Sequence, residues 1–200
     1  MKLLLTSAGL RSKNLKKFFV GQFDRLDDKT ACIVTSGRTE EEQFYIDYSI
    51  KEIGDFGIKV TEINIAKNDN FSDLPEFDIY YVCGGNTFYI LDRIRKTGMD
   101  KILIEAVRKN KFYIGVSAGS IITGPDIEIS GVKHGGDRND IKLEDLTGLK
   151  LVSFIVTPHF EEKYREAIEY FKKKRASETV ITLTDNQAVF ADENGYKIIE

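Results

Sequence analysis

Short apolar runs alternate with amphipathic segments along most of the chain. Most of these runs are continuously apolar rather than alternating, which is typical of strands in a parallel sheet covered on both faces. The strands predicted in this way span residues 2–6, 31–35, 58–63, 78–83 and 112–116. Because helical patterns separate these strands, the sequence predicts an α/β fold.

The segments between the strands carry apolar side chains at helical spacing. Helices are expected over residues 12–25, 39–54, 88–96 and 100–109. The second of these helices has the clearest ends, because Thr39 can cap its acidic first turn and Gly54 can stop it.

The last third of the chain has a different pattern. Residues 131–140 are rich in Gly, Asp and Lys and are expected to form a surface loop. A strand over 151–157 and a charged helix over 161–174 should follow. Three short strands should then form an antiparallel end to the fold, with a hairpin turn at Asn194-Gly195. These strands span residues 180–183, 188–191 and 196–199.

Composition narrows the class of protein. The 200 residues are 42% hydrophobic and 30% charged, with a net charge of −3, which favours one domain over residues 1–200 and argues against a nucleic-acid partner. No apolar run approaches the roughly 20 residues of a membrane span. Cys32 and Cys83 lie in apolar runs and are expected to be buried free thiols, which fits a cytoplasmic location. With only two histidines, far apart in sequence, a structural zinc site is not expected.

Polar and glycine-rich segments follow three of the predicted strands. They are Ser36-Gly37-Arg38, Gly84-Gly85-Asn86 and the segment around Ser117. In a parallel sheet the ligand site lies outside the carboxyl ends of the strands. The sequence therefore predicts one site to which all three segments contribute.

The segment Gly115-Val116-Ser117-Ala118-Gly119 has the Gly-x-Ser-x-Gly pattern of a nucleophile elbow. Glycines on both sides suit a sharp turn from strand to helix, with the hydroxyl of Ser117 exposed at the corner and the amide of Ala118 pointing into the same space. The pattern also occurs by chance, and a loop serine often only caps a helix.

A serine nucleophile needs a base, and histidine is the usual one. His134 lies in the polar loop, whereas His159 follows a predicted strand and is expected on the same sheet edge as Ser117. The Gly85 amide could be a second oxyanion donor. The alternative for this segment is a plain turn in which Asn86 or Thr87 caps the next helix.

Three segments together carry a resemblance to a known family. Val82-Cys83-Gly84-Gly85-Asn86-Thr87-Phe88, Gly115-Val116-Ser117-Ala118-Gly119-Ser120 and Thr157-Pro158-His159-Phe160 resemble signatures of the peptidase E family, which is related to cyanophycinase. The resemblance spans nearly the whole chain. It implies a three-layer, class I glutamine amidotransferase-like fold with a mainly parallel sheet.

The same resemblance implies a serine peptidase that acts on dipeptides or short peptides after an N-terminal aspartate, without a metal or other cofactor. Ser117 would be the nucleophile and His159 the base, and the amides of Gly85 and Ala118 would form the oxyanion hole. No membrane partner is implied, and a monomer and a homodimer both remain open.

The orienting acid is not fixed by the motifs. Family members carry a Thr-Asn-Asp stretch about fifteen residues beyond the serine, and this chain has no acid at that place. Related enzymes place an acid after the histidine, in a stretch that Thr184-Asp185-Asn186-Gln187 resembles, so Asp185 is the prediction. The alternatives are Asp126, Glu128 and Asp137.

Recognition of an acidic substrate needs a cation. Arg165 lies in a segment that resembles a family Thr-Arg-Glu segment, and Arg38 follows a strand; Asn86 is a third candidate for substrate binding. A solvated Arg165 paired with a neighbouring glutamate is the alternative.

Three other functions compete with the peptidase. A binding protein could keep the elbow and lose the acid. An amidotransferase would have cysteine at position 117, and an α/β-hydrolase esterase would place its histidine after a separate acid.

Overall fold

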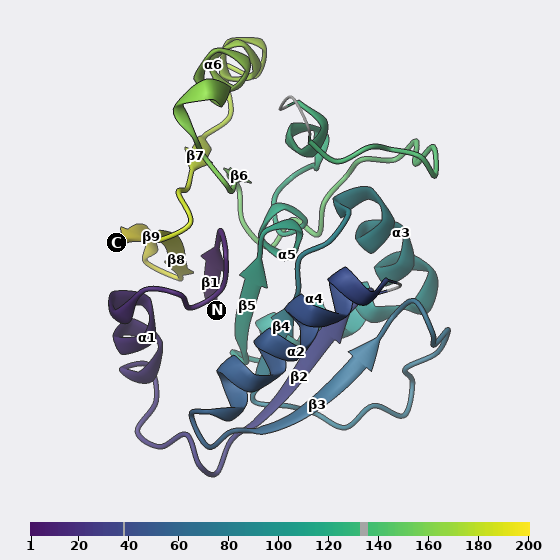
Figure 1. Ribbon diagram of the computed structural model, residues 1–200, viewed down its shortest axis with the longest axis vertical. Coiled ribbons are helices and arrows are strands. Elements are labelled where there is room, and N and C mark those ends of the chain that lie inside the picture. Colours follow the sequence, from purple (N-terminus) through teal and green to yellow (C-terminus); the bar gives the residue numbers. More distant parts are fainter. Residues whose placement is uncertain (38, 133–135) are drawn as a thin grey trace.

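A seven-stranded sheet forms the centre of the computed structural model, which describes residues 1–37, 39–132 and 136–200 (Figure 1). The strand order is β3-β2-β4-β5-β1-β8-β9. The strands are β1 (Lys2–Thr6), β2 (Thr30–Thr35), β3 (Lys59–Asn64), β4 (Ile79–Val82), β5 (Phe112–Val116), β8 (Ala188–Asp192) and β9 (Gly195–Ile199). The strands β1 to β5 are parallel to one another, whereas β8 and β9 form an antiparallel hairpin at one edge. The expected α/β fold with a mainly parallel sheet is therefore confirmed.

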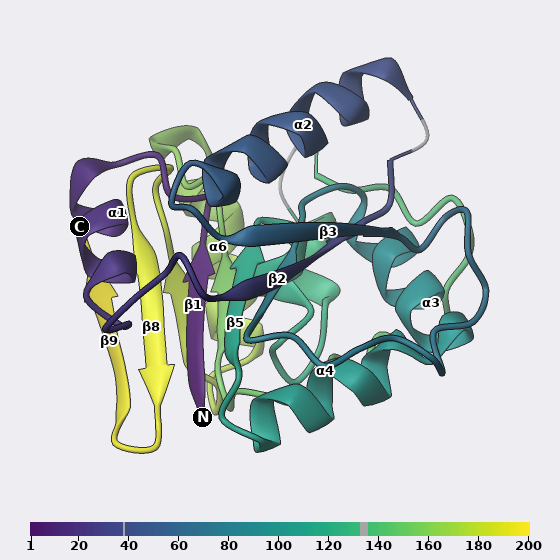
Figure 2. The same cartoon turned by 90° about the horizontal axis from the view of Figure 1, so that it is seen from below.

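Helices cover both faces of this sheet (Figure 2). Successive residues of a strand point to opposite faces, so Leu4 packs in one apolar cluster and its neighbours Leu3 and Leu5 pack in the other. The helices α1 (Lys13–Val20) and α2 (Glu40–Gly54) lie on the face of Leu4. The helices α3 (Thr87–Thr97), α4 (Met99–Arg108) and α5 (Ala118–Ile121) lie on the other face. The result is a three-layer arrangement.

The predicted helix ends agree with the structure where the capping signals are strong. Thr39 caps α2 and forms a capping box with Glu42. The first helix is shorter than its apolar pattern suggests, because Ser12 caps its start and the regular turns end before Gly21.

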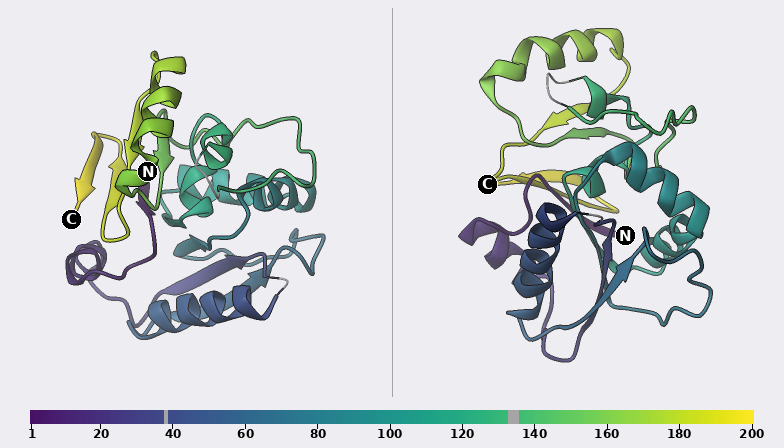
Figure 3. Two further views of the ribbon diagram at one scale, coloured as in Figure 1. Left: turned by 45° about the horizontal axis from the view of Figure 1, so that its top comes forward. Right: turned by 45° about the vertical axis from the view of Figure 1, so that its right-hand side comes forward.

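A second, two-stranded sheet lies beyond β1 and β5. It consists of β6 (Ile155–Thr157) and β7 (Val180–Thr182), which are parallel, with the 3-10 turn η2 (Glu162–Tyr164) and the helix α6 (Arg165–Lys174) between them (Figure 3). The helix between the two strands returns the chain to the end of the sheet at which the first strand began, so the second strand runs parallel to the first. The expectation that β7 belongs to the antiparallel end of the fold is therefore wrong.

Two further boundaries differ from the prediction in this region. The strand expected over 151–157 begins only at Ile155, because the backbone amides of Leu151 and Val152 donate to the Thr123 carbonyl instead. The charged helix expected from residue 161 begins as the 3-10 turn and becomes α-helical at Arg165. The expected loop over 131–140 includes His134, which lies outside the described residues; a 3-10 turn, η1 (Glu128–Gly131), precedes it.

Within the described ranges, the helices are all too short or too polar to cross a membrane.

Candidate active site

Ser117 stands at the corner between β5 and α5, in the conformation that the elbow pattern predicts. Its φ is 51°, a value that a residue with a side chain seldom adopts. Two hydrogen bonds to the end of β1 hold the corner: the Ser117 amide donates to the Thr6 carbonyl oxygen over 3.0 Å, and the Ser120 hydroxyl donates to the same oxygen over 2.8 Å. The neighbouring strand therefore fixes the place of the Ser117 side chain.

The glycine after the corner lets α5 approach the sheet closely. A Cβ atom on Gly119 would lie 2.2 Å from the carbonyl oxygen of Val82 in β4, far inside van der Waals contact. The hydroxyl of the buried Tyr113 donates to the Gly119 carbonyl oxygen over 2.7 Å. These contacts explain why the elbow pattern ends in glycine here.

His159 and Asp185 reach Ser117 from the second sheet. The His159 Nε2 atom lies 2.9 Å from the Ser117 Oγ atom, and its Nδ1 atom lies 2.6 Å from the Asp185 Oδ1 atom. His159 follows β6 and Asp185 follows β7, so the expectation that His159 shares a sheet edge with Ser117 is wrong. The two residues meet because their strands are parallel and in register, with Thr157 opposite Thr182.

Asp185 is held as a carboxylate although it is partly buried. Burial raises the pKa of this carboxyl group, but the hydrogen bonds from Ser7 and His159 outweigh that effect, and the pKa lies below its ordinary value. Ser7, which the motifs did not indicate, donates its hydroxyl proton to Asp185 Oδ1 over 2.7 Å.

The glycine turn after β4 packs against Ser117. A Cβ atom on Gly84 would lie 3.3 Å from the Ser117 Cβ atom, and Gly85 has a φ of 143° that favours glycine. Within the described part of the chain, the backbone amides of Gly85 and Ala118 donate no hydrogen bond to another residue. Both amides are therefore available to a ligand.

Cavities lie on two sides of the Ser117 and His159 pair. The larger, of about 540 Å³, runs along the carboxyl ends of β1, β2, β4 and β5, and we call it the main cleft. Its polar lining includes Ser7, Arg11, Ser36, Glu42, Ser49 and Tyr81. The smaller, of about 160 Å³, lies toward Ile129, Pro158 and Tyr164. A bound chain could thus pass Ser117 with one part in each cavity.

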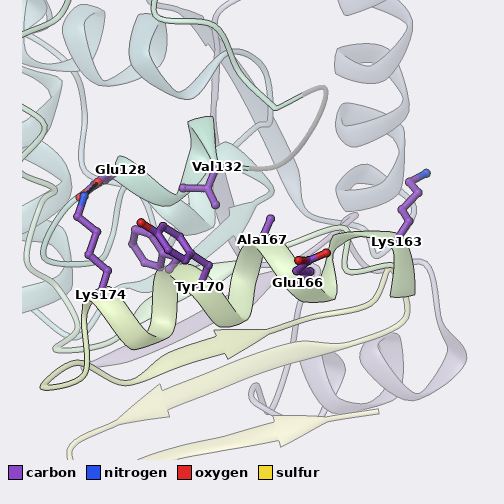
Figure 4. A pocket seen from close by; sticks show the side chains of 8 residues that line it. Glu128, Val132, Lys163, Glu166, Ala167, Tyr170 and Lys174 are labelled. Carbon is purple, nitrogen blue, oxygen red and sulfur yellow. Dashed lines mark hydrogen bonds and ion pairs between the residues drawn. The ribbon is translucent and has the colours of Figure 1, made fainter.

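The other three candidate acids contact different partners. Asp137 accepts hydrogen bonds from the amide and hydroxyl of Thr87 at the start of α3. Asp126 and Glu128 form ion pairs with Arg175, and Glu128 also binds Lys174. Glu128 borders a surface groove between η1 and α6 that does not include Ser117, His159 or Asp185 (Figure 4).

The predicted substrate-binding residues are not gathered in the main cleft. Asn86 caps α3 through the Tyr89 amide, and its Nδ2 atom donates to the Arg138 carbonyl oxygen. Arg165 forms an exposed ion pair with Glu162. Arg38 lies outside the described residues.

Arg11 is a cation of the main cleft that was not among the predicted substrate-binding residues. It lies in the loop between β1 and α1 and lines the main cleft. It makes no hydrogen bond or ion pair with another described residue. The sequence does not mark Arg11 as a site residue, because a single arginine shortly after a strand is common.

Both thiols are buried, as expected. Burial raises the pKa of Cys32 and of Cys83 to about 12. Among residues 1–37, 39–132 and 136–200, no three His, Cys, Asp or Glu side chains are grouped so that they could hold a metal ion.

Comparison with known proteins places the chain in a family. The model of peptidase family S51 matches residues 3–199. An uncharacterised peptidase of Listeria monocytogenes is 30% identical over 194 residues, which cover 94% of this chain and 93% of that protein. Peptidase E of Salmonella heidelberg is 30% identical over 128 residues, which cover 62% of this chain and 52% of that protein.

The fold has solved counterparts. A crystal structure described as peptidase E of Listeria monocytogenes EGD-e superposes with a TM-score of 0.79 and 28% identity, covering 98% of this chain and 96% of that one. A peptidase from an acI-B1 actinobacterium superposes with a TM-score of 0.68 at 14% identity, covering 98% of this chain and 86% of that one, which shows a shared fold.

These findings define the class as a serine peptidase with a class I glutamine amidotransferase-like fold. Within that class, the chain belongs to peptidase family S51, the peptidase E family.

The close approach of Gly119 to β4 predicts a large effect of a single methyl group. Gly119→Ala should lower the free energy of unfolding by about 3 kcal/mol, because the new Cβ meets backbone that cannot move aside. Gly54→Ala is the control, since a Cβ there has no neighbour within 4 Å and should stabilise α2 by about 0.5–1 kcal/mol. Urea unfolding measures both changes, and equal stability of the two variants would contradict the packing described here.

The buried thiols predict resistance to alkylation. Iodoacetamide at pH 7.5 should leave both cysteines unmodified in the folded protein, because the thiolate is the reactive form and almost none is present. Mass spectrometry measures the modification, with urea-unfolded protein as the control that must react fully. Rapid labelling of folded Cys83, which lines the main cleft, would show that this thiol is more accessible than its burial indicates.

Proposed function

We propose that Ser117, His159 and Asp185 form the catalytic triad of this peptidase. The observation that carries the proposal is the unbroken chain of contacts from Ser117 Oγ to His159 Nε2 and from His159 Nδ1 to Asp185 Oδ1, at 2.9 and 2.6 Å. Both distances are within the reach that proton transfer requires. Asp185 faces the ring nitrogen opposite Ser117, which is the place of an orienting acid.

The order of steps follows from this geometry. His159 takes the proton of the Ser117 hydroxyl as the oxygen attacks the carbonyl carbon of the peptide bond. The amides of Gly85 and Ala118 stabilise the negative oxygen of the tetrahedral intermediate. His159 then protonates the leaving amine, and a water molecule, deprotonated by His159, releases the acyl group from Ser117.

For the substrate, we propose dipeptides or short peptides with an N-terminal aspartate. Such a residue carries an ammonium group and a side-chain carboxylate. Arg11 and Glu42 bring opposite charges to the main cleft, which has the size of a small-ligand site. A guanidinium group suits a carboxylate because it can donate two parallel hydrogen bonds. Arg11 is therefore the proposed carboxylate ligand, in place of Arg165, which is paired with Glu162.

The triad predicts a large effect of a small change at Asp185. Asp185→Asn should lower kcat for an aspartyl dipeptide such as Asp-Leu by about 10⁴-fold, because the amide cannot hold the His159 ring with its proton on Nδ1. Release of free aspartate measures the rate. Glu128→Gln is the matched control and should keep full activity, since Glu128 binds Lys174 and Arg175 instead.

A serine-directed fluorophosphonate probe tests the nucleophile in the same set of proteins. The wild type should be labelled on Ser117, and Ser117→Ala and His159→Ala should remove the label. A Ser117→Ala protein that still hydrolyses the dipeptide would exclude the triad. A wild type that binds peptides without labelling or hydrolysis would instead be a binding protein that keeps the fold.

The charge in the cleft predicts specificity. Arg11→Gln should lower the ratio of kcat/KM for Asp-Leu to kcat/KM for Asn-Leu by about 10- to 100-fold, the value of a hydrogen-bonded charge pair. The ratio is the readout because any effect of the Arg11 charge on Asp185 is shared by both substrates. Arg165→Gln is the control and should preserve the ratio of the two substrates. Collapse of the ratio in Arg165→Gln, but not in Arg11→Gln, would assign carboxylate recognition to Arg165. A wild type that cleaves both dipeptides equally well would refute the aspartate preference.

A further inference from the structure

Ser7 lies at the junction of the two sheets, directly after β1. Its side chain is fully buried, with 0% exposed surface, whereas His159 and Asp185 are about half exposed. The Ser7 hydroxyl donates to Asp185 Oδ1 over 2.7 Å and accepts the backbone N–H of His159 over 2.7 Å. Its oxygen also lies 3.4 Å from His159 Nδ1. One buried hydroxyl thus contacts both residues that the second sheet brings to Ser117.

A serine hydroxyl has one proton and two lone pairs, so it can make both of these bonds at once. The donated bond fixes the Asp185 oxygen that faces His159. The accepted bond holds the His159 backbone, which has a φ of 55°. A residue with a side chain in this left-handed conformation costs about 1–3 kcal/mol and keeps it only where the surroundings impose it.

The residue before Ser7 holds the other half of the site. The Thr6 carbonyl oxygen accepts the hydrogen bonds from the Ser117 amide and the Ser120 hydroxyl. The end of β1 therefore binds the elbow through Thr6 and the histidine–aspartate pair through Ser7. Thr6 ends the strand and Ser7 follows it directly, and both are buried. Adjacent buried residues have little freedom to move relative to each other, so they set the distance from Ser117 to His159.

We propose that Ser7 is a positioning residue of the triad: its hydroxyl holds the Asp185 carboxylate and the His159 backbone in register with Ser117. The proposal rests on the catalytic roles proposed above. Ser7 borders the main cleft, but its buried hydroxyl is already bound to Asp185 and to the His159 backbone. It therefore acts on catalysis through His159 and Asp185 and not through contact with the reacting atoms.

Ser7→Ala tests this role. It should lower kcat by about 10- to 100-fold, the value of hydrogen bonds to a charged group, and change KM by less than about twofold. Ser7→Cys keeps the shape of the side chain with a somewhat larger atom in place of oxygen, and it offers only a weak hydrogen bond. It should therefore lower kcat similarly even if Ser7→Ala, which leaves a gap, folds poorly. Thr97→Ala is the control, because it removes a buried hydroxyl from α3 and should leave kcat unchanged.

A second comparison separates positioning from general support of the fold. In a His159→Ala background, adding Ser7→Ala should change the residual turnover of an activated ester substrate by less than about twofold, because the residue through which Ser7 acts is gone. Equal losses in the wild-type and His159→Ala backgrounds would overturn the proposal, as would an unchanged kcat in Ser7→Ala.

The outcomes also separate this proposal from the proposed function. If His159→Ala and Asp185→Asn leave turnover unchanged, the triad itself is wrong. If both of those variants lose turnover while Ser7→Ala and Ser7→Cys keep it, the triad stands and only the role of Ser7 is refuted.

Discussion

The parallel pairing of β6 with β7 is the constraint on which the candidate site depends. The Leu183 amide donates to the Thr157 carbonyl oxygen over 3.0 Å, and the Phe160 amide donates to the Leu183 carbonyl oxygen over 2.8 Å. Through these bonds, the segments that follow β6 and β7 leave the small sheet side by side and in the same direction. An antiparallel partner for β6 would send the segment with Asp185 to the opposite end of the strand. His159 would then lack the carboxylate that holds its ring.

Much of the fold and half of the site could be predicted from local sequence. The Thr39 cap, the apolar strands and the glycines around Ser117 act over a few residues, so their pattern is visible in the sequence. The local pattern does not fix the acid, and only the family resemblance favours Asp185. Asp126, Glu128 and Asp137 lie near the place where family members carry the acid, whereas Asp185 follows a predicted strand. Only their partners in space distinguish them: Arg175 for Asp126 and Glu128, Thr87 for Asp137 and His159 for Asp185.

The positions of Ser7 and Arg11 in the site could not be predicted from the sequence, for a related reason. Neither carries a local pattern that marks it: Ser7 contacts His159 and Asp185, which are more than 150 residues away in the sequence, and Arg11 lines a cleft formed by several strand ends. The pairing of Arg165 with Glu162, in contrast, joins residues three apart in the chain, so the sequence already indicates it. Contacts between residues that are far apart in the sequence are therefore the part of the site that the sequence pattern does not show.

The division of the site between two sheets has a consequence for how such a protein can change over evolutionary time. The corner at Ser117 tolerates few substitutions, since its glycines and its bonds to Thr6 are fixed by the packed core. Asp185 stands on a short surface turn between β7 and β8. Its carboxylate contacts Ser7 and His159. A carboxylate delivered from another loop could replace it without disturbing the core. The proposed nucleophile is therefore tied to the packed core of the fold, whereas the proposed orienting acid stands where it can be exchanged.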